Sequence, residues 1–120
     1  MGVRVLVVED DFLISMWADD ALRDAGFATI VANDAQAALN VLDAEDDIGL
    51  LFTDIDMPGA MDGLELASTV KDRWPTIPII IASGKHRPSS ADMPSHAVFL
   101  PKPYLSVDML GAVHRLCPQG

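Results

Sequence analysis

The 120-residue chain has little cysteine, little positive charge and no long apolar segment. Its single cysteine, Cys117, has no partner for an internal disulfide, so we expect a reducing compartment such as the cytoplasm. No hydrophobic run approaches the roughly 20 residues that span a bilayer. The amino terminus also lacks the basic region and cleavage site of a signal peptide. We therefore expect a cytoplasmic protein with no membrane partner.

Basic residues are scarce, because eight Lys and Arg stand against eighteen Asp and Glu, which gives a net charge of −10. A nucleic-acid surface needs clustered Lys and Arg to neutralise phosphates, and the sequence contains no such run. We therefore expect no direct nucleic-acid binding. Half of the residues are hydrophobic, which disfavours disorder, and the length suits one domain over residues 1–120.

Residues 48–53 form a short apolar run that ends in Asp54 and a proline-containing loop. A run of this length between turn residues predicts a strand buried on both faces. In open parallel sheets, ligands bind beside the carboxyl ends of the strands. Asp54 is therefore the first candidate for a reactive carboxylate.

Apolar runs alternate with helical patterns along the chain. Strands are predicted at residues 3–8, 28–32, 48–53, 76–82 and 98–100, and helices at 12–25, after Asp34, after Asp62 and at 105–116. The helical spacing places Trp17 and Val107 on the inward faces of the first and last helices. The alternation predicts an α/β fold, a doubly wound parallel sheet with right-handed crossovers.

Three adjacent acids, Glu9, Asp10 and Asp11, follow the first predicted strand. Two unit charges about 4 Å apart repel by roughly 4 kcal/mol at an effective dielectric constant near 20. Either Asp10 or Asp11 can cap the next helix, but a bound cation explains the whole cluster better. The apolar residues Phe12, Leu13 and Met16 come next, and they either pack at the margins of the helix or form a docking patch beside the acids.

Other polar residues also stand at predicted strand ends. If the first strand is central, with the third, fourth and fifth on one side, then Asp54, Ser83 and Lys102 surround the same crevice as the acids. Carboxylates suit Mg²⁺, which prefers oxygen ligands, and a hydroxyl and an ammonium group can bind phosphate oxygens. A carboxylate can also act as the nucleophile and form an aspartyl phosphate.

These residues carry a resemblance to a known family. The set Glu9-Asp10, Asp54, Met57-Pro58, Asp62-Gly63, Ser83 and Lys102-Pro103 resembles the receiver domain of bacterial two-component response regulators. The resemblance runs from residue 3 to the last helix and implies a flavodoxin-like, five-stranded parallel sheet in the order 2-1-3-4-5. It also implies that Asp54 accepts a phosphoryl group from a sensor histidine kinase or a phosphotransfer protein, and that the protein catalyses only its own phosphorylation and dephosphorylation.

The same resemblance implies roles for further residues. Mg²⁺ would be held by Asp10, Asp54 and the backbone carbonyl of Asp56, with Glu9 acting largely through water. The phosphate and switch residues would be Ser83, Lys102 and Phe99, the peptide bond before Pro103 would be cis, and Asp56 and Lys85 would overhang the phosphate and tune its hydrolysis.

The chain departs from the family pattern at two places. One extra residue lies in the loop before Asp62. Between Ser83 and Phe99, where the family has a full helix, the sequence offers two prolines and several serines, so we expect the fourth helix to be very short or missing.

Two other functions stay open at this point. Asp54-Ile55-Asp56 resembles the paired aspartates of Mg²⁺-dependent phosphatases of the haloacid-dehalogenase type, although that family has the pair after its first strand. A pseudo-receiver that binds partners without phosphorylation is the second alternative. The lead hypothesis is a stand-alone phosphorylation switch, and a receiver within a longer regulator is equally compatible with the sequence.

Overall fold

The computed structural model describes residues 4–57, 59, 61–84, 88–89, 93–94 and 96–116. The five strands are β1 (Arg4–Val8), β2 (Ala28–Ala32), β3 (Ile48–Asp54), β4 (Ile79–Ser83) and β5 (Val98–Pro101). The four helices of the described residues are α1 (Phe12–Asp24), α2 (Ala35–Ala44), α3 (Gly63–Arg73) and α4 (Ser106–Leu116). None of these helices is long and apolar enough to cross a membrane.

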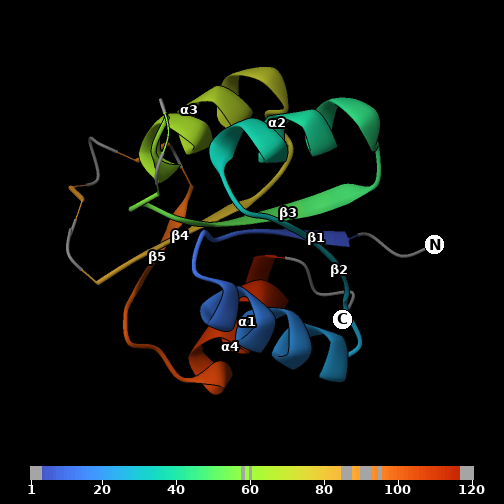
Figure 1. The fold of residues 1–120 in the computed structure, drawn as a ribbon, viewed down its shortest axis with the longest axis vertical. Helices are drawn as coiled ribbons and strands as arrows, with labels where there is room; N and C mark the ends of the chain where they lie inside the picture. Colours follow the sequence, from blue (N-terminus) through green and yellow to red (C-terminus); the bar gives the residue numbers. More distant parts are fainter. Residues whose placement is uncertain are drawn as a thin grey trace.

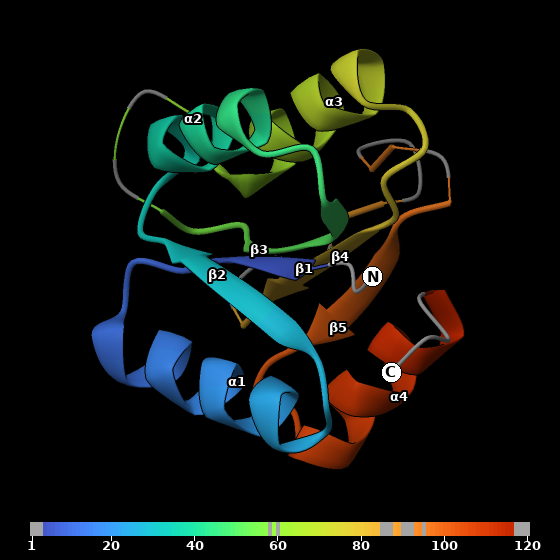
Figure 2. The ribbon, with the colours of Figure 1, turned by 90° about the vertical axis from the view of Figure 1, so that its right-hand side faces the viewer.

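The strands form one parallel sheet in the order β2-β1-β3-β4-β5. Helices α1 and α4 cover one face of this sheet, and α2 and α3 cover the other (Figures 1 and 2). The flavodoxin-like prediction is therefore confirmed, including the strand order. Since every crossover starts at the carboxyl end of a strand, the loops after β1, β3, β4 and β5 all begin at one rim of the sheet.

The apolar core has two layers, one on each face of the sheet. Alternate residues of a strand point to opposite faces, so Val5 and Val7 of β1 pack in the layer under α1 and α4. Leu6 and Val8 pack in the layer under α2 and α3. A strand with both faces buried has to be largely apolar, which explains why β1, β3 and β4 are nearly continuous apolar runs in the sequence.

Three aspartates begin the helices that start at or near this rim. Asp11 Oδ1 accepts hydrogen bonds from the backbone N–H groups of Leu13 (3.0 Å) and Ile14 (3.2 Å). Asp34 caps α2 in the same way, and Asp62 forms a capping box with Glu65 at the start of α3. Each such cap contributes about 1 kcal/mol. Asp11 is thus the acid of the cluster that caps a helix.

Some details differ from the sequence-based predictions. Trp17 is 41% exposed and Val107 is 67% exposed, although both were expected to face inward. The Trp17 ring lies at the edge of α1 against Tyr104, and Met109 takes the fully buried position near the start of α4. Strand β4 begins at Ile79 rather than Thr76, because the chain at Ile77 is still in a turn closed by its N–H to the carbonyl of Trp74.

The segment between β4 and β5 differs from a regular crossover. Its described residues, which are 84, 88–89, 93–94 and 96–97, contain no helix. The family has a helix between β4 and β5, and we predicted that it is very short or missing in this chain. Over the described residues of the segment, that prediction is confirmed. His96 adopts a positive φ of 67°, a conformation in which a helix does not continue.

Candidate functional site

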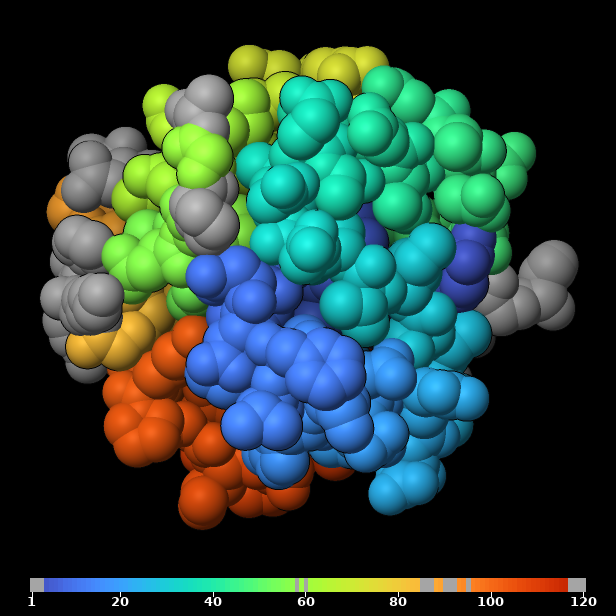
Figure 3. Space-filling model, viewed as in Figure 1, coloured from blue at the N-terminus to red at the C-terminus, as the bar shows by residue number. Residues whose placement is uncertain are grey.

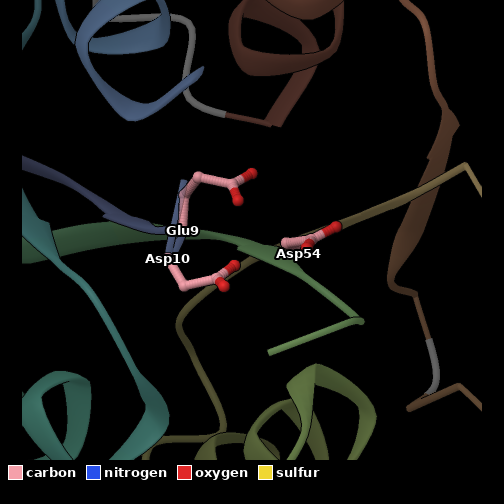
Figure 4. Close-up of side chains that lie close together, drawn as sticks. All are labelled: Glu9, Asp10 and Asp54. Atoms are coloured by element: carbon pink, nitrogen blue, oxygen red, sulfur yellow. The ribbon is translucent and has the colours of Figure 1, made fainter. Parts of the chain in front are cut away.

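The acids predicted to meet at the rim do so. The carboxylates of Glu9, Asp10 and Asp54 lie side by side at the ends of β1 and β3 (Figure 4), with one oxygen from each within 4.8 Å of the others. Glu9 and Asp54 are buried, whereas Asp10 is exposed. The site thus has a buried floor and one acid that faces the solvent.

Lys102, which follows β5, joins this cluster. Its Nζ lies 3.0 Å from Asp54 Oδ1 and 3.1 Å from Glu9 Oε1. Its backbone N–H donates to the carbonyl of Ser83 at 2.9 Å, which ties the loop after β5 to the end of β4. The Lys102–Pro103 peptide bond is cis, as the resemblance implied. One ammonium group therefore bridges two acids that come from different strands.

Burial decides the acidity of this cluster. It raises the pKa of Asp54, and the charges of Asp56 and Asp10 add to the rise, while Lys102 opposes it. Burial also raises the pKa of Glu9, against the lowering effects of the Asp11 N–H and of Lys102. Burial would lower the pKa of Lys102, but its contacts with Asp54 and Glu9 outweigh that effect and raise it. Because three carboxylates face one ammonium group in this cluster, a further cation would stabilise their ionised forms.

The donor set fits a hard divalent cation. Asp54 Oδ1 is buried, and its described partner is the Lys102 ammonium group at 3.0 Å. A carboxylate oxygen has more than one lone pair, so it can still accept from a second positive group. Three carboxylates within reach of one another offer the oxygen ligands that Mg²⁺ prefers. The site can thus hold a cation and present an oxygen of Asp54 to an incoming group.

The backbone at Asp54 is fixed by close packing against the start of α3. A Cβ atom on Gly63 would lie 1.9 Å from the carbonyl oxygen of Asp54 and 2.8 Å from the Cα of Ile55. The Gly63 N–H donates to the carbonyl of Ile55 at 2.9 Å, and the Thr53 hydroxyl donates to the carbonyl of Asp54 at 3.0 Å. Glycine is required here by space, and it sets where β3 ends.

Ser83 is buried at the end of β4, on the same rim as the acids. Its hydroxyl donates a hydrogen bond of 3.1 Å to Oδ2 of Asp56, the acid two residues after Asp54. Phe99, the proposed switch aromatic, is partly buried and packs in the layer under α2 and α3. Lys85 lies outside the described residues.

Sequence reasoning missed the aromatic wall of the site. Tyr104 packs against Trp17 and Phe52, with ring centroids 5.5 and 5.9 Å apart. Burial raises the pKa of Tyr104, and the charges of Glu9 and Asp54 raise it further. Its position two residues after Lys102 was the available signal, since an aromatic residue that closely follows a functional lysine shares its loop.

An apolar surface adjoins the acids. A groove of about 520 Å³ is lined by Ile14, Trp17, Gly84, Lys102, Pro103 and Tyr104. Phe12 and Leu13 are 72% and 74% exposed, and Met16 is also exposed, so these residues do not pack at the margins of α1. Figure 3 shows the side chains of α1 (blue) forming much of the surface in view, next to the orange segment that leads into α4.

Comparison with known proteins agrees with this geometry. The family described as response regulator receiver domain matches residues 5–113. The chain is 32% identical over 118 residues to the response regulator protein FleR of Pseudomonas aeruginosa, covering 96% of this chain and 24% of FleR. It is 35% identical over 83 residues to the transcriptional regulatory protein TctD of Salmonella typhimurium, covering 69% of this chain and 36% of TctD. The chain thus spans about a quarter to a third of these two relatives.

The fold is also similar to that of solved structures. A response regulator receiver protein from Sinorhizobium medicae superimposes with a TM-score of 0.90 at 25% identity, over 98% of this chain and 96% of that chain. With such coverage, nearly all of the compared chain corresponds to the architecture of Figure 1.

Proposed function

The chain belongs to the family of response regulator receiver domains, and we propose from this that it is a phosphorylation switch whose phosphoacceptor is Asp54. The observation that carries the proposal is the meeting of Asp54, Glu9 and Lys102, with Lys102 Nζ within 3.1 Å of both acids. A reactive carboxylate that is buried, oriented by a cation and flanked by a hydroxyl is what phosphoryl transfer to an aspartate needs.

Magnesium is the proposed cofactor. Glu9, Asp10 and Asp54 would hold it, because one oxygen from each lies within 4.8 Å of the others. The family resemblance adds the backbone carbonyl of Asp56 as a further ligand. When bound, Mg²⁺ would neutralise charge on the phosphoryl oxygens, which is the main requirement in phosphoryl transfer.

The residues of the chain divide the remaining work. An oxygen of Asp54 attacks phosphorus, and the bond from phosphorus to the donor nitrogen of a phosphohistidine breaks. Lys102 orients Asp54 before transfer and then binds a phosphoryl oxygen, since its Nζ lies 3.0 Å from Asp54 Oδ1. Ser83 supplies a hydroxyl to another phosphoryl oxygen, and Phe99 follows its movement. The burial of the site keeps bulk water away, and hydrolysis later returns Asp54 to its carboxylate form. In this scheme the protein turns over no separate substrate.

The proposed partner is a sensor histidine kinase or a phosphotransfer protein. Such a donor has to bring its histidine to Asp54, so it has to cover the surface around the acids. That surface is apolar at Phe12 and Leu13 and along the adjoining groove. Replacing Phe12 and Leu13 by alanine should slow transfer from a phosphorylated histidine protein while leaving uptake from acetyl phosphate, which needs no docking, within about twofold.

The direct test uses acetyl phosphate as donor. Incubation with Mg²⁺ and acetyl phosphate should add one phosphoryl group to the intact mass, and Asp54→Asn or EDTA should abolish the gain. Turnover of many equivalents of a phosphate monoester would instead support a haloacid-dehalogenase-type phosphatase. Absence of any mass gain in the wild-type protein with Mg²⁺ would support a phosphorylation-independent pseudo-receiver.

A further inference from the structure

We propose that Asp56 holds the hydroxyl of Ser83 in the unphosphorylated protein, so that phosphorylation of Asp54 has to break the Asp56–Ser83 hydrogen bond. This inference rests on the proposed function and assigns Asp56 a positioning role that acts through Ser83. It differs from a role of Asp56 in hydrolysis, because it concerns the state of the protein before the phosphoryl group arrives.

The geometry places both groups beside the phosphoacceptor. Strands β3 and β4 pair with Asp54 opposite Ala82, so Ser83 lies one residue beyond the pair. Ser83 is 2% exposed, and its hydroxyl donates to Asp56 Oδ2 at 3.1 Å. The end of β4 is itself held by the Lys102 N–H, which donates to the Ser83 carbonyl at 2.9 Å. The hydroxyl is therefore the part of Ser83 that is able to change partner.

The two roles of the hydroxyl exclude each other. A serine hydroxyl carries one hydrogen, so it donates one ordinary hydrogen bond at a time. In the structure that hydrogen is given to the carboxylate of Asp56. Donation to a phosphoryl oxygen on Asp54 requires that the bond to Asp56 be released. The hydrogen bond to the Asp56 carboxylate is charge-assisted, so breaking it offsets part of the free energy gained from the new bond to the phosphoryl oxygen.

Asp56 also acts through its charge, and the test has to separate the two effects. Its carboxylate is close enough to Asp54 to raise the pKa of that acid, after the larger effect of burial. The same negative charge repels an incoming phosphoryl donor. Asp56→Asn removes the charge but keeps a side-chain oxygen that can accept from Ser83. Asp56→Ala removes both the charge and the acceptor.

The experiment is a double-mutant cycle. Asp56→Asn and Asp56→Ala are each made in two backgrounds, one that keeps Ser83 and one that carries Ser83→Ala. The rate of phosphoryl uptake from acetyl phosphate with Mg²⁺ is followed by intact mass, and the affinity for beryllofluoride with Mg²⁺ gives an equilibrium value. With Ser83 present, the Ala variant should exceed the Asn variant about threefold or more in both measurements. In the Ser83→Ala background the two variants should agree within about 1.5-fold. Melting temperatures of all variants confirm that each is folded.

The outcomes separate this inference from the function on which it rests. Equal values for the Ala and Asn variants with Ser83 present would overturn it. So would the same Ala-to-Asn ratio in both backgrounds, because Ser83 would then have no part in the effect. If the wild-type protein itself takes up no phosphoryl group, the proposed function has failed, and this inference fails with it.

Discussion

Two places at opposite ends of the sheet hold one cation between two carboxylates. At the carboxyl ends of the strands, Lys102 lies between Glu9 and Asp54, whose side chains are 7% and 6% exposed. At the amino end of β1, the guanidinium of Arg4 lies between Glu45 and Asp47, whose side chains are 44% and 43% exposed. The composition of the two clusters is nearly the same, and their exposure differs greatly.

The pKa of Asp47 shifts in the opposite direction from the pKa values of Asp54 and Glu9. The hydrogen bond from Arg4, the largest effect, lowers the pKa of Asp47. Burial, the largest effect at the other end, raises the pKa values of Asp54 and Glu9 in spite of Lys102. An exposed pair keeps its acids ionised at little desolvation cost, whereas a buried pair leaves charge uncompensated. We infer from the comparison that the Arg4 cluster stabilises the fold, and we propose that the Lys102 cluster binds a ligand.

Removal of the two cations gives the largest contrast. Lys102→Ala should slow phosphoryl uptake from acetyl phosphate about tenfold or more, because a charged donor aimed at the reacting group is lost. Arg4→Ala should leave the rate within about twofold, because Arg4 lies at the far end of the sheet. Intact mass against time measures both. Equal losses in the two variants would mean that the clusters are not functionally distinct.

The two glycines within helices give the next contrast. Gly63→Ala should destabilise the protein by about 2 kcal/mol or more, because its methyl group overlaps the backbone of Asp54. Gly111→Ala is the matched control, since nothing lies within 4 Å of the added atom. In the interior of α4 it should stabilise by up to about 1 kcal/mol. Urea unfolding measures both, and a stable Gly63→Ala protein with wild-type Mg²⁺ affinity would show that this contact does not set the site.

A third contrast concerns the pH dependence of stability, which follows from the raised pKa of Asp54. A folded-state pKa above the unfolded value means that the folded protein holds the proton more tightly, so stability is lost as pH rises through the folded pKa. In EDTA, Asp54→Asn should therefore melt higher than wild type by roughly 3 °C or more at pH 7. The gain should shrink as pH falls toward about 4, near the ordinary pKa of Asp.

For Asp47 we expect the opposite dependence of stability on pH. Its folded pKa is lowered, so its stabilising contribution is present above the unfolded pKa and is lost as pH falls through the folded value. Asp47→Asn should melt lower than wild type at pH 7, by a smaller amount, and the difference should vanish in acid. Melting curves across pH decide this, and a shift of the same sign for both variants would contradict the comparison.

The smallest expected effect on the chemistry is that of Lys85. The family resemblance implies that this basic residue, like Lys102, lies beside the phosphate. Lys85→Ala should change the lifetime of the aspartyl phosphate by about threefold or more, because a charge beside the phosphate alters access of water. Decay of the phosphorylated mass after removal of acetyl phosphate measures it. An unchanged decay rate would remove Lys85 from the site.

The sequence predicted the sheet and the rim well, because both depend on short-range patterns. A strand buried on both faces is apolar throughout, and the acids after β1 and β3 stand where such runs stop. The prediction that Trp17 and Val107 face inward was wrong. Helical spacing shows which residues share a face of a helix, but it does not show how far along the helix that face is covered by the rest of the protein. The Asp56–Ser83 bond and the contact of Gly63 with Asp54 join residues from separate elements, and no local pattern encodes them.

Because the Trp17 ring contacts Tyr104, tryptophan fluorescence is a means to detect changes at the site. The chain has two tryptophans, and Trp17 contacts the loop that carries Lys102 and Tyr104. The other, Trp74, stacks against Arg73, whose guanidinium carbon lies 4.4 Å from the ring centroid. A shift of that loop would alter the surroundings of Trp17 and leave those of Trp74 as they are. Emission from a Trp74→Phe protein would then follow occupancy of the site in real time, without a label.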